Sequence, residues 1–180
     1  MKKMLGGTIR RMPISDLVQS LLKKRGITEP EAIASFLQPD YASLHDPMLL
    51  EGADRAVART MDALEKGERI AIYADFDCDG IPGASLLSDL FNKVKYENVE
   101  VYIPHRDREG YGFHTGAIEQ LAARGVKLII TVDVGTSAVD AVDFAQRLGV
   151  DVIVTDHHEI TRELPRAVAV LNPKLGEYPF

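Results

Sequence analysis

From residue 69 onward, short β-rich runs alternate with helical runs, and this alternation limits the fold more than any other feature of the chain. The predicted strands are 69–74, 99–104, 127–132, 151–155 and 167–171. Helical patterns separate the first four strands, at 83–94, 114–125 and 137–149. The strands are nearly continuous apolar runs, which is typical of strands that are covered on both faces. The pattern predicts an α/β fold with a mostly parallel sheet, right-handed crossovers and flanking helices.

The first 67 residues have a different, largely helical pattern. Helical stripes occupy 13–26, 28–38 and 52–67, and a loop rich in turn-forming residues lies at 39–50. Thr28 and Glu31 have the spacing of a capping box, with Pro30 in the first turn of the second helix. We therefore expect a short helical N-terminal leader, 1–67, packed on a core domain formed by 68–180.

Composition and charge narrow the class of protein. Hydrophobic residues make up 46% of the chain without any long apolar run, so we expect a globular protein with no membrane span. The basic segment 1–13 lacks the apolar region of a secretory signal, and the single cysteine, Cys78, fits a reducing compartment, so we expect a cytoplasmic protein. A net charge of −6 argues against simple coating of nucleic acid but permits an enzyme that meets phosphate through bound metal.

Polar side chains follow each of the first four predicted strands. They are Asp75, Asp77 and Asp79 after the first strand, His105, Arg106 and the "GYG" of 110–112 after the second, Asp133 after the third, and Asp156, His157 and His158 after the fourth. In open α/β sheets, ligands bind just beyond the carboxyl ends of the strands. These residues are therefore expected to converge on one edge of the fold.

The side chains in this set favour a divalent metal. Carboxylate oxygens with imidazole suit manganese, magnesium or zinc, and the lack of thiolates beyond Cys78 argues against a structural zinc site. Two or more carboxylates with a histidine can hold a pair of metals about 3.5–4 Å apart, which assists displacement at phosphorus. Arg106 is placed to bind a phosphate through its guanidinium fork.

Several of these residues also have structural interpretations. Asp79 either takes part in the site or only builds the turn with Gly80, and Asp156 either binds metal or orients a neighbouring histidine. Ser137 is the better N-cap candidate for the helix at 137–149 than Asp133. We interpret Tyr111 as a packing residue and Cys78 as a small apolar filler.

Four motifs occur together in a fixed order: "ADFDCDG", "IPHRDREGYG", "VDVGTSAV" and "VTDHHE". Together they resemble the DHH phosphoesterase family, whose name corresponds to Asp156, His157 and His158. Within the family, "FLQPDYASLHDPMLL" before the first motif and "ELPRAVAVLNPKLGEYPF" after the last are similar to bacterial exonucleases specific for single-stranded DNA. The resemblance covers essentially the whole chain.

The resemblance implies a Rossmann-like three-layer domain that binds one or two Mn²⁺ or Mg²⁺ ions and hydrolyses phosphodiester bonds. It further implies 5′-to-3′ digestion of single-stranded DNA in recombination and repair. By the motifs, the implied metal ligands are Asp75, Asp77, Asp133 and His157. Of these, Asp133 would bridge two metals. His158 matches a catalytic residue near the scissile phosphate, and Arg106 matches an arginine that holds a terminal phosphate.

The chain also departs from the family pattern. Tyr73 stands where relatives have histidine, and Val134 stands where they have asparagine. Pro82 stands where they have threonine or a small residue. A further ligand aspartate and the C-terminal DHHA1-type and OB-type domains are absent. We therefore expect an N-terminal piece of a longer protein, whose activity alone is open and whose missing regions would bind single-strand-binding protein or helicase partners.

Two other functions stay open at this point. One is a DHH phosphodiesterase that acts on oligoribonucleotides, cyclic dinucleotides or other small phosphoesters. The other is a non-catalytic DHH scaffold that has lost its metals, which the changes at Pro82 and Val134 would permit.

Overall fold

The computed structural model describes residues 14–178, which divide into two units between Leu44 and His45. The first unit holds helices α1 (Asp16–Lys24) and α2 (Pro30–Leu37) and the 3-10 turn η1 (Tyr41–Ser43). The second unit holds the sheet and its helices, preceded by the 3-10 turn η2 (Pro47–Leu49). The basic segment 1–13, on which part of the cytoplasmic prediction rests, lies outside the described residues.

The two N-terminal helices form where they were predicted, but the predicted capping box is wrong. The N-cap of α2 is Glu29, and no side chain caps this helix. Pro30 explains the difference, because its fixed φ suits the first helical position and its ring clashes with a helical conformation of the residue before it. Glu29 is accordingly extended, with φ −73° and ψ 138°.

Five parallel strands form a single sheet in the order β2-β1-β3-β4-β5. Their bounds are β1 (Arg69–Ala74), β2 (Val99–Tyr102), β3 (Val126–Val132), β4 (Asp151–Thr155) and β5 (Ala169–Leu171). All four pairings are parallel, so the predicted parallel sheet is confirmed. β2 ends before the predicted residue 104, where Pro104 has no N–H to donate to a ladder.

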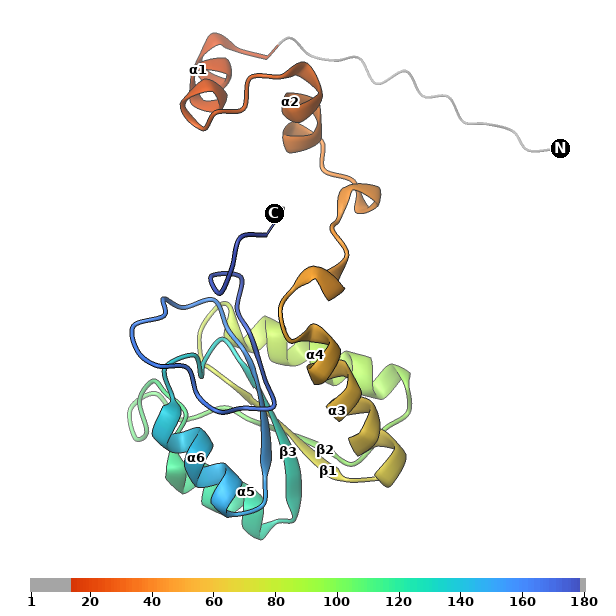
Figure 1. Ribbon diagram of the computed structural model, residues 1–180, viewed down its shortest axis with the longest axis vertical. Coiled ribbons are helices and arrows are strands. Elements are labelled where there is room, and N and C mark those ends of the chain that lie inside the picture. The colour runs from red at the N-terminus through yellow and green to blue at the C-terminus, as the bar shows by residue number, and fades with distance from the viewer. Residues whose placement is uncertain (1–13, 179–180) are drawn as a thin grey trace, which may run out of the picture. The chain divides into compact units, whose positions relative to one another are not determined.

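Helices cover both faces of the sheet, as the apolar strands predicted. On one face, α3 (Ala53–Lys66) and α4 (Gly80–Lys93) pack on Ile70, Ile72 and other strand residues. On the other face, α5 (Thr115–Ala123) and α6 (Val139–Arg147) pack on the alternate strand residues, among them Ala71 and Tyr73. Figure 1 shows α5 and α6 on the opposite side of the sheet from α3 and α4. The result is a three-layer α/β domain.

α3 is part of the sheet's own core, although the predicted leader extends to residue 67. Ala56 and Ala63 of α3 are buried in the same cluster as Ile70 and Ile72. The helix ends at Gly67, whose φ of 65° supplies the left-handed C-cap. The division of the chain into a leader and a DHH domain stays a prediction.

The turn after β1 is tighter than predicted, because α4 begins at Gly80 instead of residue 83. Asp79 is therefore the N-cap of α4, and Pro82 lies in its first turn, where a missing N–H removes no intrahelical bond. A Cβ on Gly80 would lie 2.3 Å from the carbonyl oxygen of Asp75. Only glycine lets the helix start this close to the end of β1.

Two smaller expectations about single side chains are wrong. The N-cap of α6 is Ala138 without any side-chain cap, so the assignment of Ser137 is wrong; its hydroxyl lies 3.3 Å from that of Thr161 instead. Cys78 is exposed and free, so it does not fill the core. Over residues 14–178, no helix is both long and apolar enough to cross a bilayer.

Replacing Gly80 with alanine tests the close approach of α4 to β1. We expect Gly80→Ala to lower the free energy of unfolding by about 3 kcal/mol, because the new Cβ meets backbone atoms that cannot move independently. Gly116→Ala in α5 is the matched control, since nothing lies within 4 Å of its Cβ position and alanine favours helix by about 1 kcal/mol. Urea denaturation followed by circular dichroism measures both, and equal effects of the two changes would contradict this account.

Candidate metal centre

The sheet order places the ends of β1 and β3 at a topological switch point. After β1 the chain enters α4 on one face of the sheet, and the segment after β3 leads to α6 on the other face. Such a divergence opens a crevice outside the strand ends, where ligands of open α/β folds bind. Asp75 directly follows β1 and Asp133 directly follows β3, so both residues lie at this crevice. The amide of Asp75 donates to the Val132 carbonyl at 3.2 Å, which fixes the two strand ends side by side.

Asp133 has a strained backbone. Its φ is 62°, in the left-handed region that non-glycine residues rarely adopt. The surrounding structure holds this conformation, since the Asp133 amide donates to the Thr155 carbonyl at 2.9 Å. Such strain is concentrated at functional sites. Here it directs a side chain that is only 7% exposed into the crevice.

Three aspartates gather in the crevice. One oxygen each from Asp75, Asp77 and Asp133 lies within 4.8 Å of the others. Asp75 and Asp133 are buried, and Oδ1 of each has no hydrogen-bond partner among the described residues. Unpaired buried carboxylate oxygens are costly unless a cation compensates them. The donor set and its unpaired oxygens therefore fit a divalent metal ion.

Asp77 has a second, structural task in the turn before α4. Its Oδ1 accepts the amides of Asp79 at 2.9 Å and Gly80 at 3.1 Å. These two bonds, led by that from Gly80, lower the pKa of Asp77 and keep it ionised. Asp77, not Asp79, is therefore the turn-building carboxylate, and its side chain also faces Asp133.

The histidines after β4 face the same cluster. Asp133, His157 and His158 form a second group whose candidate ligand atoms lie within 4.8 Å of one another. Nε2 of His157 is 3.0 Å from Oδ1 of Asp133 but lacks the geometry of a hydrogen bond. It also lies 3.7 Å from Oδ2 of Asp79, whose side chain is exposed. Asp133 thus belongs to both groups, as a residue shared by two metal positions would.

Asp156 orients the histidines and belongs to neither group of candidate ligands. Its Oδ1 accepts the amides of His157 and His158 and lies 2.7 Å from Nδ1 of His158, while Oδ2 accepts the Thr136 amide. Although burial opposes ionisation, these bonds together lower the pKa of Asp156. An ionised Asp156 requires the proton of His158 on Nδ1, and the same contact raises the pKa of His158. Of the two interpretations left open for Asp156, the structure favours the orienting one.

Asn172 is a supporting residue that the sequence interpretation missed. It is fully buried directly after β5, and its Nδ2 donates to the Thr136 hydroxyl and to the His158 carbonyl, both at 2.9 Å. It therefore holds the loop after β3 against the histidines after β4. The rule that strand ends carry function would have found Asn172 if it had been applied to the fifth strand.

Tyr73 is packed into the sheet's core and lies in neither group of candidate ligands. Its ring is fully buried against Tyr102 and Phe113, at centroid distances of 5.3 and 4.9 Å. Its hydroxyl donates to the Gly112 carbonyl at 2.9 Å. Tyr73 therefore supports the loop after β2. Val134 is likewise a core residue, only 2% exposed.

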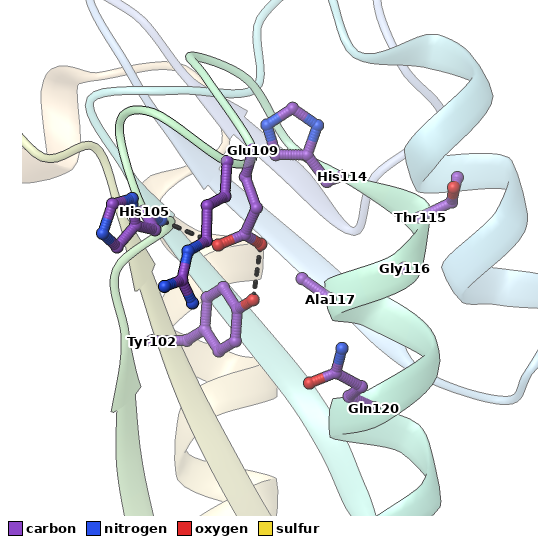
Figure 2. A pocket seen from close by; sticks show the side chains of 9 residues that line it. Tyr102, His105, Glu109, His114, Thr115, Gly116, Ala117 and Gln120 are labelled. Atoms are coloured by element: carbon purple, nitrogen blue, oxygen red, sulfur yellow. Dashed lines mark hydrogen bonds between the residues drawn. The ribbon is translucent and has the colours of Figure 1, made fainter.

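The loop after β2 is fixed by Glu109. Its carboxylate accepts the Tyr102 hydroxyl at 2.6 Å and the His105 amide at 2.7 Å, as Figure 2 shows. Glu109 and its partners line a hollow of about 560 Å³ beside the N-terminus of α5. Arg106 of this loop is exposed, and its guanidinium stacks on the Phe76 ring at 4.4 Å. This side chain is thus held next to the turn that bears Asp75 and Asp77.

Tyr111 of the same loop reaches the cluster, although the sequence indicated only packing. Its hydroxyl is 3.3 Å from Nδ1 of His158, and the two rings lie 5.5 Å apart. Burial, followed by the charges of Asp156, Asp75 and other nearby carboxylates, raises the pKa of Tyr111. The sequence signal was available, since Tyr111 lies in one of the four motifs.

Without a metal, ionisation of Asp133 lowers the stability of the folded protein. Burial, then the neighbouring Asp77, raises the pKa of Asp133 to about 6. A folded pKa above the unfolded value of 3.8 means that the protonated form favours folding, so stability is lost as the pH rises from about 4 through 6. A cation would reverse this effect, because it favours the ionised form.

Asp133→Asn should stabilise the metal-free chain while removing metal binding. Asparagine has nearly the same shape, tolerates positive φ and carries no charge. We expect the melting temperature at pH 7.5 to rise by about 3 °C and the gain to vanish near pH 4. Asp89→Asn, at an exposed carboxylate of α4, is the control and should change neither property. A lower melting temperature for Asp133→Asn would contradict this account.

Metal affinity should depend on pH through the same carboxyl group. Because a proton must leave Asp133 before a metal binds, the apparent Mn²⁺ affinity should rise about tenfold between pH 5 and pH 7 and then level off. Titration calorimetry in two buffers of different ionisation enthalpy measures both the affinity and the protons released. An affinity that is constant from pH 5 to 7 would show that Asp133 does not bind the metal.

Comparison with known proteins shows which family the chain resembles. Residues 69–178 match the model described as the DHH family, N-terminal domain. The single-stranded-DNA-specific exonuclease RecJ of Bacillus subtilis is 41% identical over 172 residues, which cover 94% of this chain and 22% of that protein. RecJ of Escherichia coli is 38% identical over 131 residues, 73% of this chain and 23% of that protein.

Two solved structures are similar. A crystal structure of exonuclease RecJ bound to manganese matches with a TM-score of 0.67 and 31% identity, over 73% of this chain and 34% of that one. RecJ from Thermus thermophilus in complex with Mn²⁺ matches with a TM-score of 0.66 and 26% identity, over 88% of this chain and 22% of that one. The chain thus spans about a fifth to a third of these proteins. Since the family model covers more than half of its residues, the chain belongs to the DHH family and contains that family's N-terminal domain.

Proposed function

We propose that this chain is the metal-binding part of an exonuclease that hydrolyses phosphodiester bonds in single-stranded DNA from the 5′ end. One observation carries the proposal: Asp75 and Asp133 are buried at the switch point, each with an oxygen that accepts no hydrogen bond, within reach of Asp77 and His157. This set of oxygen and imidazole ligands suits Mn²⁺ or Mg²⁺.

The proposed ligands are Asp75, Asp77, Asp133 and His157. One or two bound ions would activate water and offset the charge of the phosphate. His158, held by Asp156 with its proton on Nδ1, presents Nε2 near the scissile phosphate. Arg106, stacked on Phe76, offers its guanidinium N–H groups to a terminal phosphate.

The relatives support the substrate and the metal. The matching proteins are named as exonucleases specific for single-stranded DNA, and the two solved neighbours contain manganese. The net charge of −6 means that most of the affinity for DNA would come from regions beyond this chain. Roles in repair and recombination, a cytoplasmic location and contacts with helicases or single-strand-binding proteins remain predictions.

The test uses a chimera, because this chain spans only part of its relatives. The chain replaces the matching region of B. subtilis RecJ, and release of mononucleotides from 5′-phosphorylated single-stranded DNA is measured with Mn²⁺. We expect release to depend on the metal and to exceed release from the same sequence as duplex by more than about tenfold. Asp133→Asn should lower the rate by about a thousandfold or more, as expected when a shared ligand is lost, and Asp89→Asn should leave it unchanged.

Other outcomes would replace the proposal. An Asp133→Asn chimera as active as the unmodified chimera would show that Asp133 is not a ligand. Hydrolysis of dinucleotides or cyclic dinucleotides, but not of long strands, would favour the small-phosphoester function. A protein that binds no metal and is inactive in every assay would favour the non-catalytic scaffold.

A further inference from the structure

Two polar side chains that carry no charge, Thr136 and Asn172, are buried beside the metal centre, and the proposed function gives them no role. Thr136 lies in the loop after β3 and is 2% exposed, and Asn172 directly follows β5 and is fully buried. A buried polar group costs free energy unless its hydrogen bonds are made. The partners of these two side chains therefore indicate what they do.

Asn172 uses both of its amide hydrogens. Its Nδ2 donates to the Thr136 hydroxyl and to the His158 carbonyl, both at 2.9 Å. Its Oδ1 accepts the Lys174 amide at 2.9 Å. Because a carbonyl can only accept and an amide N–H can only donate, these contacts allow a single orientation of the Asn172 side chain.

Thr136 connects Asn172 to Asp156. The Thr136 amide donates to Oδ2 of Asp156 at 2.8 Å. Since the Thr136 hydroxyl oxygen accepts from Asn172, the hydroxyl proton is left to bond Asp156. Although burial opposes ionisation, hydrogen bonds that include the Thr136 amide, the His158 ring and the Thr136 hydroxyl lower the pKa of Asp156.

The contacts close a ring of four residues. The ring runs from Asn172 through Thr136 and Asp156 to the imidazole of His158, and it returns from the His158 carbonyl to Asn172. His158 is therefore held at its side chain and at its backbone. The four residues follow β3, β4 and β5, which are neighbours in the sheet, so the core supports every member of the ring.

We propose that Asn172 and Thr136 are positioning residues for phosphodiester hydrolysis, which hold the imidazole of His158 toward the phosphate at the candidate metal centre. The inference rests on the proposed function and adds to it two residues that act only through others. The His158 side chain is 46% exposed, so packing alone restrains its ring weakly. A displacement of about 1 Å at a reacting centre can lower a rate about a hundredfold, so a ring in this place depends on buried support.

Two substitutions at Thr136 separate its hydroxyl from its packing. Valine keeps the shape and loses the hydroxyl, whereas serine keeps the hydroxyl and loses a methyl group. In the chimera with B. subtilis RecJ, we expect Thr136→Val to lower kcat on 5′-phosphorylated single-stranded DNA by about tenfold or more, and Thr136→Ser by about twofold. KM should change by less than about twofold in both, because neither change removes a contact with the substrate. A packing role predicts the reverse order of the two variants.

Asn172→Ala is tested on the 180-residue chain by nuclear magnetic resonance, without turnover. We expect the ring-nitrogen resonances of His158 to shift and its Nδ1 proton to exchange with water about tenfold faster. The ring resonances of His114, which is held away from Asn172 by the loop after β2, should stay the same. Asn98→Ala is the matched control, since the exposed Asn98 also donates to a backbone carbonyl, that of Gly67, at 2.9 Å. Mn²⁺ affinity, measured by calorimetry, should change by less than about twofold in both variants.

Several outcomes would overturn the inference. They are a Thr136→Val chimera as active as Thr136→Ser, unchanged His158 resonances in Asn172→Ala, and loss of Mn²⁺ binding in Asn172→Ala, which would place its effect on the metal ligands instead of His158. If Asn172→Ala does not fold, the two Thr136 variants still decide. An unmodified chimera without activity would instead overturn the proposed function, and the inference with it.

Discussion

The mutual repulsion of carboxylates at the ends of β1 and β3 is the constraint around which the rest of the structure is arranged. Asp75 and Asp133 are buried, each has an oxygen that accepts no hydrogen bond, and both lie within reach of Asp77. Without a cation, this arrangement costs stability, as the raised pKa of Asp133 indicates. Packing alone does not explain why these carboxylates are buried close together. A divalent ion between them would attract each carboxylate and offset their mutual repulsion.

The fold holds these groups in place by rigid means. The parallel sheet fixes the strand ends, Gly80 lets α4 begin against the backbone of Asp75, and Asp77 accepts two backbone amides of that turn with one oxygen. Asp156 and Asn172 then hold His158 in place through hydrogen bonds. The candidate ligands thus lie on strand ends and short turns that the core supports, which is how precise sites are built.

The sequence predicted the sheet, its helices and the convergence of polar residues, because strand periodicity and the strand-end rule depend on local pattern. It did not predict the details set by tertiary contacts. The start of α4 depends on how closely Gly80 approaches Asp75, and the failed cap at Thr28 depends on Pro30. Tyr111 looked like a packing residue because nothing local shows that the Glu109 and Tyr73 contacts turn it toward His158. The roles of the candidate ligands stay predictions.

The most direct measurement is anomalous diffraction from crystals of this chain soaked in Mn²⁺, with data collected on both sides of the manganese absorption edge. The account predicts an anomalous peak within coordination distance, about 2.0–2.4 Å, of oxygens from Asp75, Asp77 and Asp133. A second peak, if two ions bind, should lie on the other side of Asp133, toward His157. Fully soaked crystals with no peak at this crevice, or with a peak elsewhere only, would contradict the claim that these carboxylates are arranged for a metal.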